Sequence, residues 1–122
     1  EVIRILGALG GRIDQTLGNI FLLTKPELAE VDIRLVDGEQ EVFLIRESAQ
    51  ITGKSGQHVS LLPLHQAAKG IRSTGLKYQL DGETLYPDRT RGISNVMEVD
   101  FASIEVKQGM LLCIHEFSIE AP

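Results

Sequence analysis

The sequence predicts a mainly β protein in which a C-terminal β-sandwich follows a short α/β unit of strand, helix and strand. In residues 2–36, two apolar runs flank a glycine-rich bend and a segment with helical spacing. After the turn at residues 37–38, short β-type runs are regularly interrupted by Gly, Asp and Ser, which is typical of a sandwich or barrel. The two patterns meet near residue 40, so we divide the chain into segments 1–40 and 41–122.

The first segment has the order of a βαβ unit. Apolar residues around Arg4 predict a buried strand over 2–6, and the alternation in "VDIRLV" (31–36) predicts a second strand. Asp14 is a suitable N-cap for the helix between them. Pro26 ends that helix or begins a short second turn. In the second segment, Asp81-Gly82 predicts a hairpin turn between "LKYQL" and "ETLY", and residues 97–101 alternate like a half-exposed strand.

Composition excludes several classes of protein. At 122 residues and 43% hydrophobic, the chain can bury one good core or two small ones, and no apolar run has membrane-spanning length. A net charge of −5 argues against binding nucleic acid, which needs a basic face. The lone Cys113 cannot form an internal disulfide, and the start lacks a signal-like segment, so we expect a cytoplasmic protein. Because position 1 is Glu and a strand follows at once, we also expect a piece of a longer protein.

The glycine-rich bend is the first candidate site. Gly7, Gly10 and Gly11 follow the first strand, where open α/β sheets place ligands, although a tight turn alone would also need glycine. Arg12 stands beside the helix N-terminus, where a guanidinium and backbone amides could share a phosphate. Asp14 is either only an N-cap, or it orients Arg12 or holds a metal-bound water.

The loop "RGISN" (91–95) reads from composition as a turn. Three histidines, His58, His65 and His115, form no metal-ligand spacing with one another or with Cys113, so we interpret them as surface or strand-face residues. Cys113 lies in an apolar run and is predicted to be a buried small hydrophobe.

Four segments together resemble one family. "GALGGRIDQTLGNI" (7–20) resembles the glycine-rich segment of thiamine pyrophosphokinases, in which Gly-Gly-Arg is followed by Asp and then His or Gln. "SLLPL" (60–64), "STGLKYQL" (73–80) and "RGISN" resemble, in the same order, segments of that family's C-terminal β-sandwich. The resemblance runs from Gly7 to about Gly109.

The resemblance implies a magnesium-dependent enzyme that transfers diphosphate from ATP to the hydroxyethyl oxygen of thiamine, giving thiamine diphosphate and AMP. It also implies a homodimer with a shared active site. Segment 1–40 would be the C-terminal piece of the α/β nucleotide (catalytic) domain, and 41–122 the thiamine-binding β-sandwich.

Site residues carried over from the family fall in two of the motifs. The catalytic cleft would be lined by Arg12, Asp14 and Gln15, and the nucleotide would be held by Gly10, Gly11 and Arg12. Ser94 and Asn95 would lie near the thiamine pyrimidine. Gln15 replaces a His common among bacterial members, and Gly92 stands where some members have a serine.

The family's magnesium-binding aspartate cluster, a Gly-Asp-Phe-Asp-Ser type segment, is not found in these 122 residues. We therefore expect the magnesium ligands upstream of this chain. The chain alone is expected to be inactive and to bind neither Mg²⁺ nor ATP. The competing hypothesis is a stand-alone β-sandwich module for binding or dimerisation, in which the glycine bend is purely structural.

Overall fold

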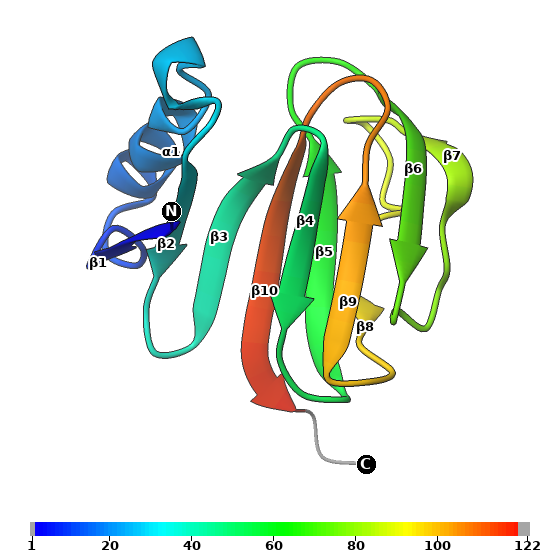
Figure 1. The fold of residues 1–122 in the computed structure, drawn as a ribbon. Coiled ribbons are helices and arrows are strands. Elements are labelled where there is room, and N and C mark those ends of the chain that lie inside the picture. Colours follow the sequence, from blue (N-terminus) through cyan, green and yellow to red (C-terminus); the bar gives the residue numbers. More distant parts are fainter. Residues whose placement is uncertain (1, 120–122) are drawn as a thin grey trace.

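The computed structural model describes residues 2–119 and extends one sheet of a β-sandwich with the α/β unit (Figure 1). The strands are β1 Val2–Leu6, β2 Asp32–Val36, β3 Gln40–Ile45, β4 Ser48–Thr52, β5 Gln57–Pro63, β6 Ala68–Thr74, β7 Asp81–Leu85, β8 Asn95–Val96, β9 Phe101–Glu105 and β10 Leu111–Ile119. The helices are α1 Ile13–Leu22 and the short 3₁₀ helix η1 Pro26–Leu28. One sheet has the order β1-β2-β3-β10-β5-β8 and the other β4-β9-β6-β7. The predicted fold class is confirmed.

The main core lies between the two sheets. The alternation of side chains along a strand produces this core. In β5, every second residue from Gln57 to Pro63 is buried, and the residues between them are half-buried. The buried members of this core come from both sheets and their connections: Phe43, Ile45, Ile51, Val59, Leu61, Ala68, Ile71, Leu76, Leu80, Leu85, Met97, Ala102, Ile104, Val106, Leu111 and Cys113. The expectation for Cys113 is therefore confirmed.

A second, smaller core lies on the opposite face of the six-stranded sheet. Ile20 and Leu23, in and just after α1, are clustered with Leu35, Val42 and Leu112. Strands β3 and β10 thus bury side chains on both faces, which explains why "VFLI" (42–45) and "MLLCI" (110–114) are continuous apolar runs.

The α/β unit forms the predicted parallel strand pair. β1 pairs with β2 from Val2↔Asp32 to Leu6↔Val36, and Pro26 begins η1. The predicted burial of the first strand is wrong, because every residue of β1 is exposed at the edge of the sheet. The sheet continues across residue 40, because β2 pairs antiparallel with β3 through Leu35↔Val42. The division into segments 1–40 and 41–122 stays a prediction.

The predicted N-cap is wrong. Helix α1 begins at Ile13, and its N-cap is Arg12, which has extended backbone (φ −76°, ψ 134°) and no capping side-chain bond. The first turn already closes on Arg12, because the backbone N–H of Thr16 donates to the Arg12 carbonyl at 3.1 Å. Asp14 therefore lies inside the first turn, where its negative charge suits the positive end of the helix dipole.

The predicted hairpin turn at Asp81-Gly82 is also wrong. These residues open β7, where Asp81 pairs with Arg72 and the register shifts next to Gly82 (φ +76°). The connection is made by residues 75–80, which insert Leu76 and Leu80 into the main core. Burial of two leucines outweighs the local turn preference, and Gly82 instead accommodates a bulge.

The half-exposed strand predicted over 97–101 is interrupted. Met97 is buried and bridges Leu76, the chain bends at 98–100, and β9 begins at Phe101. The bend is held by Asp100, whose carbonyl accepts from Gly53 N (3.0 Å) and whose carboxylate accepts from Ser55 N (2.9 Å). Among the described residues, no helix is long and apolar enough to cross a membrane.

Two glycines give a matched stability test. Gly75 and Gly82 have nearly the same positive φ, +82° and +76°. A Cβ at Gly75 would lie 2.3 Å from the Phe101 carbonyl oxygen, whereas at Gly82 the nearest atom is 3.7 Å away. We expect Gly82→Ala to lower the free energy of unfolding by about 1–2 kcal/mol through backbone strain alone. Gly75→Ala should cost distinctly more in urea denaturation. Equal losses would contradict the close backbone approach at Gly75.

Candidate functional site

The glycine bend needs glycine for backbone conformation. Gly7, Gly10 and Gly11 have φ of +77°, +81° and +73°. A Cβ built on any of them meets no atom of the described chain within 4 Å. The left-handed backbone is therefore sufficient to explain these residues, and the space above them is open. Contact with a nucleotide stays a prediction.

Side chains of α1 hold this bend in place. The Thr16 hydroxyl lies 3.2 Å from the Gly10 carbonyl oxygen, and Asn19 Nδ2 donates to the Ala8 carbonyl at 3.1 Å. These bonds turn two loop carbonyls toward the helix. The N–H groups of its first turn are then the natural partners for an anion.

The structure brings Arg12 and Asp14 together. Arg12 Nη2 lies 2.6 Å from Asp14 Oδ2, and the two side chains are 75% and 61% exposed. Gln15 follows in the same exposed turn, and its N–H donates to Asp14 Oδ1 at 2.9 Å. This arrangement fits the alternative in which Asp14 orients Arg12. Because the pair is exposed, it is weak and can open for a ligand.

The described residues do not fit a magnesium site by themselves. Across residues 2–119, no three side chains of His, Cys, Asp or Glu gather as metal ligands do. Asp14, the acid nearest to the glycine bend in sequence, is paired with Arg12. The predicted acidic cluster stays a prediction for residues outside this chain.

Strand β5 clamps the loop that carries Ser94. Leu61 N donates to the Gly92 carbonyl at 2.8 Å, and Ser94 N donates to Ser60 Oγ at 2.9 Å. Ser94 has a positive φ of +61° and an exposed side chain. Gly92 is buried, and a Cβ there would lie 2.3 Å from the Leu61 carbonyl oxygen. This backbone leaves no room for a serine side chain at position 92.

Asn95 has a clear structural task. Its Oδ1 accepts from Tyr78 N at 3.0 Å and from Val96 N at 2.9 Å, while its Nδ2 donates to the Tyr78 carbonyl at 2.8 Å. The residue is only 3% exposed. The amide thus takes the place of a backbone partner for Tyr78, a residue that is itself 51% exposed. Contact of Ser94 or Asn95 with thiamine stays a prediction.

The two predicted groups of site residues lie at opposite edges of the six-stranded sheet. The glycine bend follows β1, at one edge, and Ser94 precedes β8, at the other. Five strand spacings separate these edges, a distance of about 24 Å. One copy of this chain therefore does not bring Arg12 and Ser94 into one site.

A chain of polar contacts that the sequence analysis missed runs through the sheet. Arg34 Nη1 donates to Glu41 Oε1 at 2.8 Å, and Glu41 Oε2 lies 2.8 Å from His115 Nδ1. His115 Nε2 lies 2.6 Å from Gln57 Oε1, and Arg34 also bonds to Asp32. The predicted strand-face position of His115 is confirmed, since it lies in β10, and its side chain is fully buried.

Electrostatics within this contact chain favour charged partners. Burial alone would raise the pKa of Glu41, but hydrogen bonds from His115 and Arg34 outweigh it and hold that pKa below its ordinary value. Burial likewise opposes the charge on Arg34, yet its bonds to Asp32 and Glu41 raise its pKa. The guanidinium also stacks 3.9 Å from the ring centroid of Phe43.

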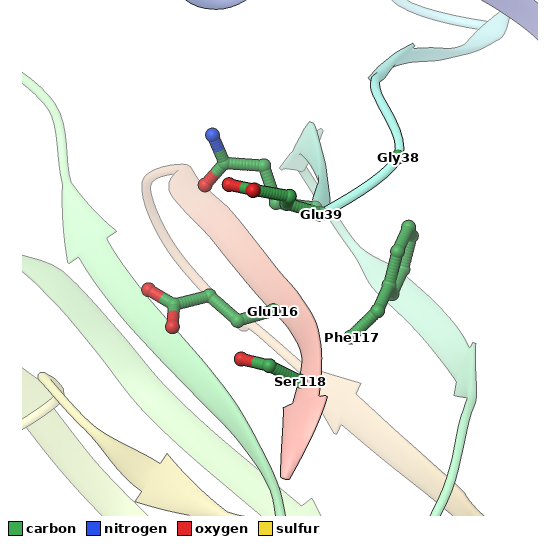
Figure 2. A pocket seen from close by; sticks show the side chains of 6 residues that line it. Gly38, Glu39, Glu116, Phe117 and Ser118 are labelled. Atoms are coloured by element: carbon green, nitrogen blue, oxygen red, sulfur yellow. The ribbon is translucent and has the colours of Figure 1, made fainter. Parts of the chain in front are cut away.

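Two hollows of the surface do not coincide with a predicted site. A groove of about 1070 Å³ between the α/β strands and β4 has Arg34, Glu41 and Phe43 among its lining residues. A second hollow of about 470 Å³ is lined by Gly38, Glu39, Gln40 and residues 116–118. Figure 2 shows the carboxylates of this second hollow pointing to the same side, away from the ring of Phe117. Such an acidic lining does not suit a phosphate group.

Comparison with known proteins agrees with the resemblance. The family model described as "Thiamin pyrophosphokinase, vitamin B1 binding domain" matches residues 43–111. The chain belongs to this family. Ser94 and Asn95 lie inside the matched range, whereas the glycine bend lies before it.

Relatives of this vitamin B1 binding domain extend the match to the α/β unit. Thiamine pyrophosphokinase of Bacillus subtilis is 28% identical over 93% of this chain and 54% of its own length. Thiamine pyrophosphokinase 1 of Oryza sativa is 30% identical over 84% of this chain and 40% of its own length. The crystal structure of the Bacillus subtilis protein superposes with a TM-score of 0.86, covering 97% of this chain and 56% of that one. The chain thus spans about half the length of these relatives.

Replacing Asn95 tests its structural task. Because its amide satisfies both backbone groups of Tyr78, Asn95→Ala should lower the free energy of unfolding by about 1–3 kcal/mol, measured by chemical denaturation. The exposed neighbour gives a control, since Ser94→Ala keeps the backbone bond to Ser60 and should change stability little. An unchanged midpoint for Asn95→Ala would refute the backbone role.

Proposed function

We propose that this chain is the thiamine-binding part of a thiamine diphosphokinase, which transfers diphosphate from ATP to thiamine and releases AMP. The observation that carries the proposal is the family match over residues 43–111, which includes Ser94 and Asn95. The relatives named thiamine pyrophosphokinase, aligned over 84–93% of this chain, support extending it to the α/β unit. We also place the parent protein in the cytoplasm, in keeping with the single, buried cysteine of this chain, Cys113.

Arg12 and the glycine bend supply phosphate binding in this proposal. The hydroxyethyl oxygen of thiamine attacks the β-phosphorus of ATP, the bond from that phosphorus to the AMP oxygen breaks, and the alcohol proton leaves to solvent. Arg12 turns from Asp14 toward the transferring oxygens, together with the amides of Gly10 and Gly11. Gln15 lines the same cleft and positions the substrate. The parent protein binds ATP and Mg²⁺, and we assign the magnesium ligands to residues outside 2–119.

Two copies of the chain must then share each active site. Arg12 and Ser94 lie at opposite edges of one sheet, and the edge strands β1 and β8 are about 24 Å apart by strand spacing. A symmetric dimer can bring the glycine bend of one copy to the Ser94 loop of the other. We therefore propose a homodimer in which thiamine binds to Ser94 and Asn95 of one copy and receives the diphosphate beside Arg12 of its partner.

Complementation in the full-length parent tests the shared site. Arg12→Ala and Ser94→Phe should each abolish formation of thiamine diphosphate in its own homodimer. Coexpressed, they form mixed dimers with one intact site, so a random mixture should regain about a quarter of the wild-type activity. The control mixes Arg12→Ala with Asp14→Ala, which affect the same half of the site and should not complement. Absence of recovery in verified mixed dimers would refute the shared site.

The 122-residue chain alone should give no ATP-dependent thiamine diphosphate. Its described residues contain no acidic cluster that could hold a metal between phosphates. Product formation by the purified chain, followed by chromatography, is the measurement. Turnover near that of the full-length parent would overturn the assignment of the magnesium ligands to other residues.

A further inference from the structure

The side chain of His115 is enclosed by hydrogen-bond acceptors. It is fully buried in β10 between β3 and β5, opposite Glu41 in the strand register. Nδ1 lies 2.8 Å from a carboxylate oxygen of Glu41, and Nε2 lies 2.6 Å from Oε1 of Gln57. The ring of Phe117 meets it edge-on at 5.1 Å.

The amide orientation of Gln57 is fixed by two backbone groups. Its Oε1 accepts from Lys54 N at 3.0 Å, and its Nε2 donates to the Phe117 carbonyl at 2.7 Å. A flipped amide would set a donor against the Lys54 N–H and an acceptor against the Phe117 carbonyl. Oxygen therefore faces His115, so Nε2 of the imidazole must carry a proton.

Glu41 fixes the other ring nitrogen. Its Oε1 accepts from Arg34 at 2.8 Å, which favours the ionised carboxylate. An ionised carboxylate can only accept, so Nδ1 of His115 must also carry a proton. A neutral imidazole has one N–H and would leave one of these two short contacts between acceptors.

We infer that His115 is held as an imidazolium, and that its charge makes the joint between the α/β unit and the sandwich sensitive to pH. The charges alternate along Asp32, Arg34, Glu41 and His115, and the contact chain crosses β2, β3, β10 and β5. Arg34 also reaches the Gln50 carbonyl of β4 at 3.2 Å, so the same chain joins the two sheets.

Among the charged groups near His115, Glu41 is the one in direct contact with its ring. Glu41 faces it from β3, with Arg34 and Asp32 of β2 behind that carboxylate. Gln57 faces it from β5, and Gly53 packs on the ring from the connection between β4 and β5. On its own strand, Cys113 is buried, and its pKa is raised by burial and by the charge of Glu41. The thiol is therefore neutral and does not compete for the proton.

The sign of the pH dependence follows from the protons bound. In the folded chain, Glu41 and Gln57 hold a proton on each ring nitrogen of His115, whereas an imidazole in the unfolded chain has no such acceptors for the second proton. The folded state then binds more protons, so the free energy of unfolding falls as pH rises through the neutral range. At acidic pH the dependence is reversed. The pKa of Glu41 is lowered in the folded chain, so the stability that its carboxylate contributes is lost as pH falls through that pKa.

Nitrogen NMR of the imidazole rings in the 122-residue chain tests the inference directly. At pH 7, both ring nitrogens of His115 should give the shift of a protonated nitrogen. His65, which is exposed, is the internal reference for an imidazole in water. A neutral tautomer of His115 at pH 7, with one unprotonated ring nitrogen, would overturn the proposal.

Glu41→Gln tests the joint. The new carboxamide can donate to Nδ1, so His115 should become neutral, and the fall of the melting temperature between pH 6 and 9 should disappear. Glu39→Gln removes the same charge from an exposed neighbour outside the contact chain and should keep the wild-type fall of several degrees. The same pH slope in wild type and Glu41→Gln would overturn the proposal. If Glu41→Gln does not fold, the NMR result decides alone.

Discussion

Burial of β3 and β10 on both faces is the constraint on which the rest of this structure depends. Phe43 and Leu111 contribute to the core between the sheets, while Val42 and Leu112 contribute to the core under α1. One pair of adjacent strands therefore joins two hydrophobic cores. Removal of the helix would expose the second core, and removal of the four-stranded sheet would expose the first.

The same two strands carry the centre of the polar contact chain, Glu41 on β3 and His115 on β10. Glu41, Gln57 and His115 all occupy core-facing positions of their strands, in phase with Phe43, Val59 and Cys113. A polar group at such a position must find partners within the protein, because water does not reach it. No buried side-chain nitrogen or oxygen among the described residues lacks a partner. The contact chain thus permits polar residues in the core and at the same time fixes the α/β unit on the sandwich.

The candidate site residues, unlike the contact chain, lie on the surface at the two edges of the sheet. Arg12 and Asp14 are exposed at one edge of the sheet, and Ser94 is exposed at the other. Hydrogen bonds hold each loop: α1 side chains bond to the glycine bend, and Ser60 of β5 accepts from the backbone of Ser94. Preformed loops on separate edges are suited to a site completed by a second copy, because little reorganisation is needed when the copies meet.

The sequence alone was sufficient to predict the features that depend on local residue patterns. Period-two alternation, the glycine bend before a helical segment and the apolar run around Cys113 predicted the mainly β fold, the parallel βαβ unit and a buried cysteine. Ordered motifs along the chain resembled the family that the match over residues 43–111 shows. These features depend on neighbours in the chain, so a single sequence shows them.

Only the tertiary structure decided the features that depend on residues distant in sequence. Asp81-Gly82 became a bulge because Leu76 and Leu80 gain more by entering the core than a tight turn provides locally. His115 became the centre of a polar contact chain because strand pairing sets it beside residues 41 and 57, which are 74 and 58 positions away. The alternation of β10 did place His115 in phase with the core, but its partners follow from register, and register is fixed by the packing of the whole sheet.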